Sequence, residues 1–285
     1  MKDAIKKKIM EFQKNEITEH EIYRILAKRV GGKNGEILKS ISLDEKKHYM
    51  QWKKYTGEDV KPSRFAIFKY SLLQRIFGIT FAVKLMERGE ENAEKAYEDI
   101  SREIPEAKSI LEDEFEHEDM LLKMLDERKI SYLGSMVLGI NDAMVELTGA
   151  LAGLTFALEN ARVTGFVGFI TGIAASLSMA SSEYLSKKSE GGNPVRAAFY
   201  TGIAYLITVI LLILPYFLLN DYRMALFFTI CMAIFVIYIF TFFIAVVKDM
   251  IFWKLFMEMA AISMGIAFIS FLIGWSIRVF FNIQI

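Results

Sequence analysis

Two Glu-x-x-His pairs, Glu45–His48 and Glu114–His117, are the residues of this sequence whose types and spacing most clearly allow metal chemistry. Residues three apart lie on one face of a helix, so each pair offers a carboxylate and an imidazole to the same point. Both groups suit ferrous iron and manganese, and the sequence does not separate these two ions. One pair is common on charged helices, but two pairs on separate helices predict a metal site.

Four segments of the first 130 residues have the amphipathic spacing of helices, and each carries a carboxylate on its apolar stripe. The stripes cover residues 5–30, 38–55, 76–100 and 110–124. A lone buried carboxylate is unfavourable, whereas four together are explained by a cation between them. We therefore expect an all-α unit in which four helices surround a metal site. The alternative is a purely structural bundle whose acidic faces are solvated.

Turn positions indicate which glutamate of the first helix can meet the histidine pairs. Glu16 and the Glu45–His48 pair lie almost equally far from Gly31-Gly32, so a hairpin at the glycines brings them level. This symmetry favours Glu16 over Glu19 as a ligand. His20 is expected at the surface.

The third helix supplies Glu90 by its stripe position, in preference to Glu87, and Glu94, one turn further on, is an additional candidate. One Glu from each of two helices with Glu-x-x-His from each of the other two is the ligand inventory of a four-helix di-iron site. The predicted metal ligands are Glu16, Glu45, His48, Glu90, Glu94, Glu114 and His117.

Residues 131–285 are strongly apolar and are predicted to span a membrane. A spanning helix needs about 20 mostly apolar residues. Five stretches qualify: Tyr132–Leu158, Phe166–Tyr184, Ala197–Leu219, Met224–Val247 and Phe256–Phe280. Five spans place the termini on opposite sides. The connections on the side of the N-terminus hold more Lys and Arg than the others, which predicts a cytosolic N-terminal domain and a C-terminus outside.

The first two predicted spans carry polar side chains at membrane depth. Asp142 and Glu146 are one helical turn apart, as are Met179 and Glu183. A charge at this depth costs at least ~2.5 kcal/mol, so such residues usually face a cavity or a partner. Carboxylates with a thioether favour a borderline ion such as ferrous iron over sodium or calcium. Alternatively, Met179 belongs to the core and Glu183 lies at the cytosolic interface.

These two spans resemble the vacuolar iron transporter family. The resemblance rests on the segments VLGINDAMVELTGALAG, from Val137 to Gly153, and AASLSMASSEYLS, from Ala174 to Ser186. It implies that Asp142 and Glu146 line an ion path that Met179 and Glu183 complete across a homodimer interface. It also implies exchange of cytosolic ferrous iron, sometimes manganese, for protons. The long acidic insert of eukaryotic members is replaced here by the short connection Lys187–Arg196.

Residues 5–128 resemble the ferritin-like superfamily, and within it rubrerythrin. The resemblance rests on Glu16 followed by Tyr23, on the Gly89-Glu90 step and on both Glu-x-x-His pairs. It implies a di-iron centre, with Ala93 in place of the extra ligand of the third helix. Fusions of the two kinds of domain are known and are interpreted as iron exporters.

Composition narrows the remaining possibilities. The 285 residues have zero formal net charge and no separate basic stripe, which gives no reason to expect nucleic acid as a partner. The single cysteine, Cys231, excludes a disulfide or cysteine-rich metal site within one chain. The charged N-terminus, Met1–Lys8, has no apolar core and so is not a signal peptide.

The sequence therefore predicts two domains, a cytosolic ferritin-like di-iron bundle over residues 1–130 and a five-span transport domain over 131–285. Together they would form an exporter of iron(II), with manganese as an alternative ion, that lies in the cell membrane and works as a metal/proton antiporter. Its expected partners are membrane lipid and a second copy of the chain. No catalytic residue is assigned. The alternative is a membrane-anchored di-iron ferroxidase or peroxidase. A membrane scaffold with a purely structural bundle is a third reading.

Overall fold

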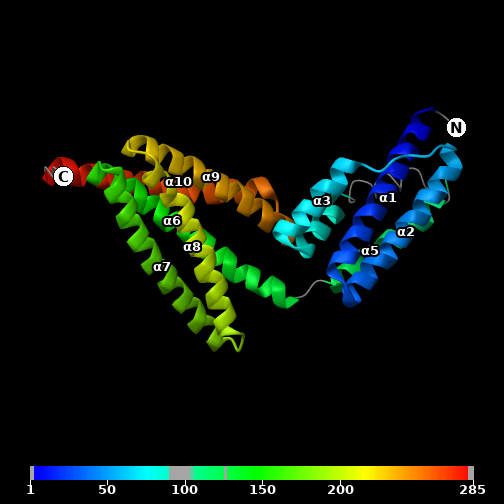
Figure 1. Ribbon diagram of the computed structural model, residues 1–285, viewed down its shortest axis with the longest axis horizontal. Coiled ribbons are helices and arrows are strands. Elements are labelled where there is room, and N and C mark those ends of the chain that lie inside the picture. The colour runs from blue at the N-terminus through cyan, green and yellow to red at the C-terminus, as the bar shows by residue number, and fades with distance from the viewer. Residues whose placement is uncertain (1–2, 90–103, 105, 125–126, 282–285) are drawn as a thin grey trace. The chain divides into compact units, whose positions relative to one another are not determined.

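The computed structural model describes residues 3–89, 104, 106–124 and 127–281, and the regular structure of this part of the chain is entirely helical. The predicted all-α class is confirmed. The labelled helices are α1 (Asp3–Val30), α2 (Gly32–Thr56), α3 (Arg64–Phe77), α5 (Glu106–Met124), α6 (Glu127–Leu158), α7 (Ala161–Ser189), α8 (Pro194–Leu218), α9 (Tyr222–Val247) and α10 (Phe252–Phe281) (Figure 1). Residues 79–89 are also helical.

The chain divides into two compact units, Met1–Asp126 and Glu127–Ile285. In the first unit, α1 and α2 form a hairpin whose reversal lies at Gly31 and Gly32. Both glycines have positive φ, 63° and 57°, a conformation that strains residues with a β-carbon. The predicted turn is thus where the chain reverses, and it places the middle of α1 beside the middle of α2.

Two apolar clusters form the core of the first unit. One is built from Ile9, Phe12, Trp52, Ile104, Ala107 and Ile110. The other is built from Ile22, Tyr23, Leu26, Leu38, Ile41, Val83, Met86, Leu121 and Met124. Helices α1, α2 and α5 each contribute residues to both clusters. On each helix, a short segment separates the residues of one cluster from those of the other. Polar residues of these three helices can therefore meet between two apolar layers.

Helix α3 was not anticipated from the sequence. Ser63 caps its start by accepting a hydrogen bond from the Ala66 backbone N–H, and the helix ends at Gly78, whose φ is 88°. The predicted third stripe began at Ile76, but Ile76 belongs to α3 and is exposed. The stripe becomes interior only after the break at Gly78, because the chain enters a new helix there.

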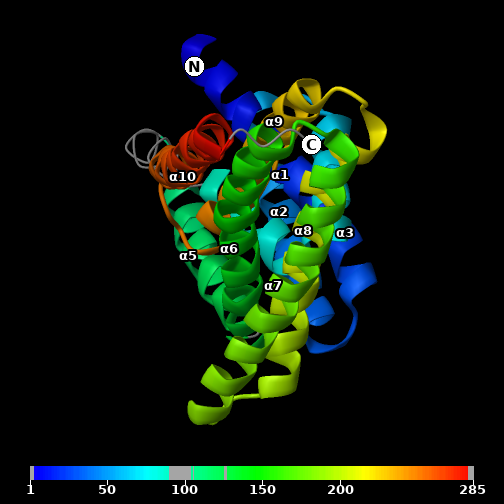
Figure 2. The ribbon, with the colours of Figure 1, turned by 90° about the vertical axis from the view of Figure 1, so that its left-hand side faces the viewer.

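The second unit consists of α6 to α10, and each of these helices contains a stretch long and apolar enough to cross a membrane. These stretches are 25 to 29 residues long, above the roughly 20 that a bilayer requires. All five predicted spans are therefore present as helices. Helices α6, α7 and α8 lie side by side (Figure 2), so the two spans with polar residues pack against each other and against α8.

Close helix approach fixes α6 within the second unit. A β-carbon on Gly274 of α10 would lie 2.1 Å from the Gly153 carbonyl oxygen, so the two backbones meet with no room for a side chain. Gly149 likewise faces Ile266 of α10, and Gly172 of α7 faces Val209 of α8. Gly149 and Gly153, which are one helical turn apart on α6, therefore serve contacts within one chain.

Candidate metal centre and ion path

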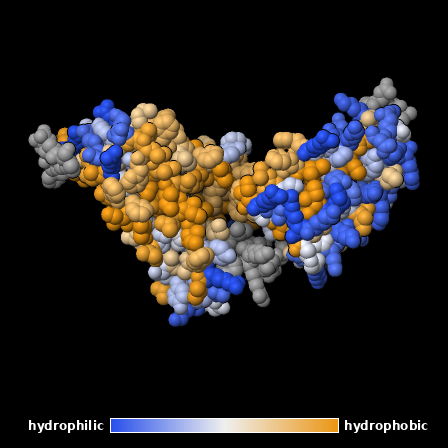
Figure 3. Space-filling view, in the orientation of Figure 1, coloured by the Kyte–Doolittle hydropathy of each residue, from blue (hydrophilic) through white to orange (hydrophobic). Residues whose placement is uncertain are grey.

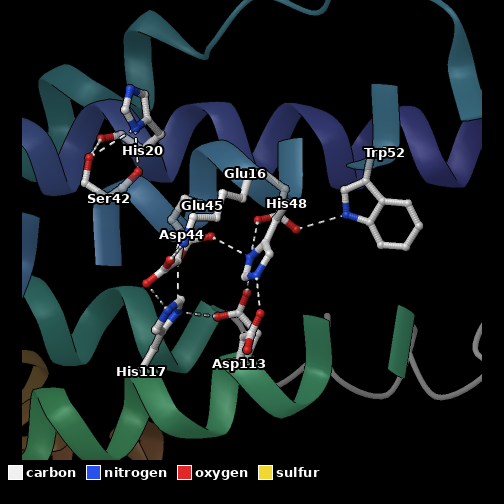
Figure 4. A network of polar contacts seen from close by, with 11 residues as sticks. Glu16, His20, Ser42, Asp44, Glu45, His48, Trp52, Asp113 and His117 are labelled. Atoms are coloured by element: carbon white, nitrogen blue, oxygen red, sulfur yellow. Dashed lines mark hydrogen bonds and ion pairs between the residues drawn. The ribbon is translucent and has the colours of Figure 1, made fainter. Parts of the chain in front are cut away.

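The first unit brings four potential ligands together from three helices. Glu16 of α1, Glu45 and His48 of α2, and Glu114 of α5 each offer an atom within 4.8 Å of the others (Figure 4). Glu16, Glu45 and His48 are buried, and Glu114 is nearly so. On each of the three helices, these ligands lie in the segment between the residues of the two apolar clusters. Apolar side chains therefore flank the ligands on both sides.

The two histidines point the same ring nitrogen into this cluster. Nδ1 of His48 lies 3.4 Å from carboxylate oxygens of Glu45 and Glu114 and 3.5 Å from Glu16 Oε2. Nδ1 of His117 lies 3.2 Å from Glu45 Oε1 and 3.4 Å from Glu114 Oε2. Glu45 and Glu114 thus each direct one oxygen to each histidine, and the imidazole centroids are 5.9 Å apart.

Two aspartates that the sequence reasoning missed occupy the other ring nitrogens. Nε2 of His48 donates to Asp113 Oδ2 over 3.1 Å, and Nε2 of His117 lies 3.6 Å from Asp44 Oδ2. Each aspartate directly precedes the glutamate of one pair and contacts the histidine of the other pair. A carboxylate on the outer nitrogen of a histidine fixes the tautomer that leaves the inner nitrogen for a metal. The doubled pattern Asp-Glu-x-x-His was the available signal.

Burial and mutual contact control the ionisation of this cluster. Burial raises the pKa of Glu16 to about 8. Burial opposes ionisation of Glu45 as well, but the contacts with His117 and His48 outweigh it and lower its pKa to about 2. Burial disfavours charge on both imidazoles too, yet the surrounding carboxylates raise the pKa of His117 to about 10 and also raise the pKa of His48. Without a metal, the cluster therefore retains protons at pH 7.

Two further side chains lie beside the ligand cluster without being part of it. The Trp52 indole N–H donates to Glu16 Oε1 over 3.1 Å, which fixes the orientation of that carboxylate. His20, expected at the surface, is buried instead: its Nδ1 donates to the Ser42 carbonyl over 2.6 Å. It is held by the contact between α1 and α2 and belongs to a separate hydrogen-bonded pair.

Two of the predicted ligands, Glu90 and Glu94, lie outside the described residues. The other five, Glu16, Glu45, His48, Glu114 and His117, converge on the cluster. Among these five, Glu16 adjoins His48. The described part of the cluster is thus the greater part of the predicted ligand set.

The acidic residues of the second unit are held separately. Glu183 is buried and accepts a hydrogen bond of 2.6 Å from the Ser135 hydroxyl of α6. Glu146 accepts one of 2.9 Å from the Tyr205 hydroxyl of α8. Asp142 is half-buried, and Met179 packs against the apolar core of the unit. Among the residues the structure describes, the carboxylates of Asp142, Glu146 and Glu183 do not gather into one ligand cluster within the chain.

Comparison with known proteins relates the second unit to a transporter family. Residues 133–192, which include most of α6 and all of α7, match the model of the VIT family. The match and the five apolar helices fit the membrane domain of that family, and they identify the chain as an integral membrane protein. The match suggests a metal-ion transporter. No curated protein matches the chain.

Proposed function

We propose that this protein exports ferrous iron, with manganese as an alternative ion, from the cytosol in exchange for protons. In this proposal the first unit is a cytosolic ferritin-like, rubrerythrin-like bundle with a di-iron centre that binds or oxidises the metal. The observation that carries the proposal is the convergence of Glu16, Glu45, His48 and Glu114, from three helices, between two apolar clusters.

The donor set fits a metal on physical grounds. Glu45 Oε2 and His48 Nδ1 are both buried, and neither makes a hydrogen bond among the described residues. Buried polar atoms without such bonds are rare, and a bound ion is one of the arrangements that explain them. Carboxylates with imidazole suit iron and manganese in the divalent state. Such a centre would supply reversible one-electron chemistry at each ion.

The positions of Glu45 and Glu114 support two ions rather than one. Each carboxylate faces both histidines, so both would help to hold a centre of two ions. Glu16 would be the terminal ligand on the His48 side. Glu90 would provide the ligand of the third helix, with Glu94 as an additional ligand.

In the second unit, Asp142, Glu146, Met179 and Glu183 would pass the ion across the membrane. Because they do not gather within one chain, we propose that two copies complete the path across a homodimer interface. Proton coupling follows from the ligands, since a carboxylate binds either a proton or a metal and each displaces the other.

The orientation of the chain follows from its connecting segments. Lys187 and Lys188 lie in the last turn of α7 and Arg196 lies in the first turn of α8, whereas the segments that join α6 to α7 and α8 to α9 carry fewer basic residues. Basic residues concentrate on the cytosolic side. This supports an N-terminus in the cytosol and a C-terminus outside, an orientation in which the first unit meets the metal before export.

Transport into inside-out vesicles tests the proposal. Vesicles with an acidic interior should accumulate ferrous iron, and Asp142→Ala should reduce uptake to that of vesicles without the protein. Glu190→Ala is the matched control, because Glu190 is an exposed carboxylate paired with Lys187 in the connection after α7, and it should transport normally. Uptake by Asp142→Ala at the wild-type rate would show that the assigned path is wrong.

A second candidate function is a membrane-anchored di-iron ferroxidase or peroxidase. It is favoured by the same placement of Glu45 and Glu114 between two histidines, because a two-ion centre held by these residues would supply redox chemistry. The two candidates differ in what Asp142 does. The enzyme function replaces the exporter if three results hold. The wild-type chain oxidises ferrous iron or consumes peroxide, the wild-type chain transports no iron, and Asp142→Ala keeps the same turnover.

A further inference from the structure

Helix α3 presents an apolar face that the first unit does not bury. Four large apolar side chains are exposed on it: Phe65, Phe68, Leu72 and Ile76. Their spacing of three, four and four residues places them on one side of the helix. Orange side chains over α3 mark this face in Figure 3. We call these four residues the α3 face.

The opposite side of α3 is attached to the first unit. Ile67 and Tyr70 pack against the apolar cluster that contains Ile22 and Tyr23. Arg29 of α1 donates to the Ser71 carbonyl and to the Gln74 side chain, both over 3.1 Å. The helix is therefore held by one side, and the α3 face is turned outward in a fixed orientation.

The charges of α3 all have one sign. The helix carries Arg64, Lys69 and Arg75 and contains no acidic residue. All three basic residues are exposed. An apolar face accompanied only by basic side chains is the composition of helices that lie in the interface of an anionic bilayer. Anionic headgroups complement the three cations, while the apolar side chains enter the boundary of the acyl chains.

We propose that the α3 face docks the first unit on the anionic surface of the membrane that α6 to α10 cross. The bilayer is present wherever the chain is, since the same chain spans it, so even a weak contact has a high effective concentration. Docking by α3 restricts how the first unit stands on the membrane. It gives a physical role to an exposed apolar stripe that a water-soluble surface would disfavour.

A depth probe on the full chain tests this docking. Replacing the single cysteine by Cys231→Ser allows one labelled cysteine to be placed by Phe68→Cys, with an environment-sensitive fluorophore. The protein is placed in nanodiscs of phosphatidylglycerol that contain lipids spin-labelled near the headgroup. Leu43→Cys on α2 is the matched control, because Leu43 is also an exposed apolar residue, 51% against 65% for Phe68.

Docking predicts a blue-shifted, lipid-quenched signal at position 68 and a water-like, unquenched signal at position 43. Phosphatidylcholine, or the triple change Arg64→Glu, Lys69→Glu and Arg75→Glu, should reduce the quenching at position 68. Each basic residue near an anionic surface contributes about a fivefold preference. These surface changes spare the contacts of Arg29, so the fold of the first unit should survive them.

Three results would overturn the proposal. Equal quenching at positions 68 and 43 would remove any special role for α3. Quenching at position 68 that ignores both the lipid charge and the triple change would exclude recognition of anionic headgroups. A probe shielded from water but not quenched by lipid would show that protein, such as a second copy, covers the α3 face.

Discussion

The two units of this protein treat their carboxylates in opposite ways. In the first unit, Glu45 and Glu114 face two histidines at 3.2 to 3.4 Å. In the second unit, Glu146 and Glu183 each accept a hydrogen bond from a neutral hydroxyl on a neighbouring helix. The first unit therefore collects charged ligands at a single point, whereas in the second unit Glu146 and Glu183 are each satisfied by a different hydroxyl group.

This difference follows from the surroundings of the helices. In the first unit, two apolar layers confine a polar layer, where carboxylates and imidazoles neutralise one another. Inside a membrane little water reaches a helix, so a carboxylate on a membrane helix is usually satisfied by a donor on a neighbouring helix. A path formed by Asp142, Glu146, Met179 and Glu183 must therefore be completed by a second copy or by a change in helix packing.

The largest expected effect is that of pH on metal binding by the first unit. Glu16, His48 and His117 all have raised pKa values and hold protons at pH 7, so a metal must displace up to about three protons. Affinity should then rise with pH, at most roughly a thousandfold per pH unit. Calorimetric titration of ferrous iron or manganese in buffers of different ionisation enthalpy counts the released protons. Binding without proton release would separate the metal from this cluster.

The same pKa shifts predict how the metal-free first unit responds to pH. The raised pKa values of Glu16, about 8, and His117, about 10, stabilise the fold at low pH, and this stability is lost as pH rises through those values. The lowered pKa of Glu45 stabilises the fold above its ordinary value of 4.5 and is lost as pH falls towards 2. The unfolding temperature of metal-free protein should therefore fall between pH 7 and 10, and bound metal should reduce this change.

Removal of a carboxylate that faces both histidines should have the next largest effect. Glu114→Ala should weaken metal binding by at least about a hundredfold, since even indirect partners of metal ligands cost ten- to a hundredfold. Glu118→Ala is the matched control, because Glu118 is an exposed glutamate on the same helix. Glu183→Ala should leave binding by the first unit unchanged. If Glu114→Ala and the wild type bind the metal with equal affinity, the carboxylates of the first unit do not form a metal site, and the contrast between the two units is wrong.

Local periodicity was enough to predict most of the cluster. Stripe position and the Gly31-Gly32 turn placed Glu16 beside Glu45 and His48, because a hairpin pairs residues equally far from its turn. Convergence of these residues required only that the stripes face inward. The membrane helices could be predicted equally well from the sequence, since length and apolar composition alone define them.

What the sequence concealed depends on tertiary contacts. His20 shares a face of α1 with Glu16, yet only the packing of α2 brings the Ser42 carbonyl to it. The break at Gly78 separates α3 from the following helix, and the apolar stripe of α3 gave no sign that it would stay exposed. Pairing of Glu146 with Tyr205 joins residues 59 apart, which no local pattern indicates.

A smaller effect is expected from the aspartates behind the histidines. Asp113→Asn keeps the shape of the side chain but removes the charge that orients His48, and it should weaken metal binding by about ten- to a hundredfold. Glu112→Gln tests the neighbouring exposed carboxylate, which pairs only loosely with Lys108 at 3.9 Å, and should have no effect. If both substitutions weaken binding equally, the cause is the overall charge of α5 and not the contact with His48.

The smallest effect concerns the separate hydrogen bonds of the second unit. Tyr205→Phe removes the hydroxyl that donates to Glu146 while keeping the buried ring. A hydrogen bond of this kind contributes about 1 kcal/mol, so the transport rate should fall by about fivefold, with metal binding by the first unit unchanged. Tyr216→Phe is the matched control, because the Tyr216 hydroxyl meets Thr155 and no carboxylate. If the transport rate falls equally in the two variants, the cause is altered helix packing. The hydrogen bond to Glu146 would then give no support for Glu146 as part of the ion path.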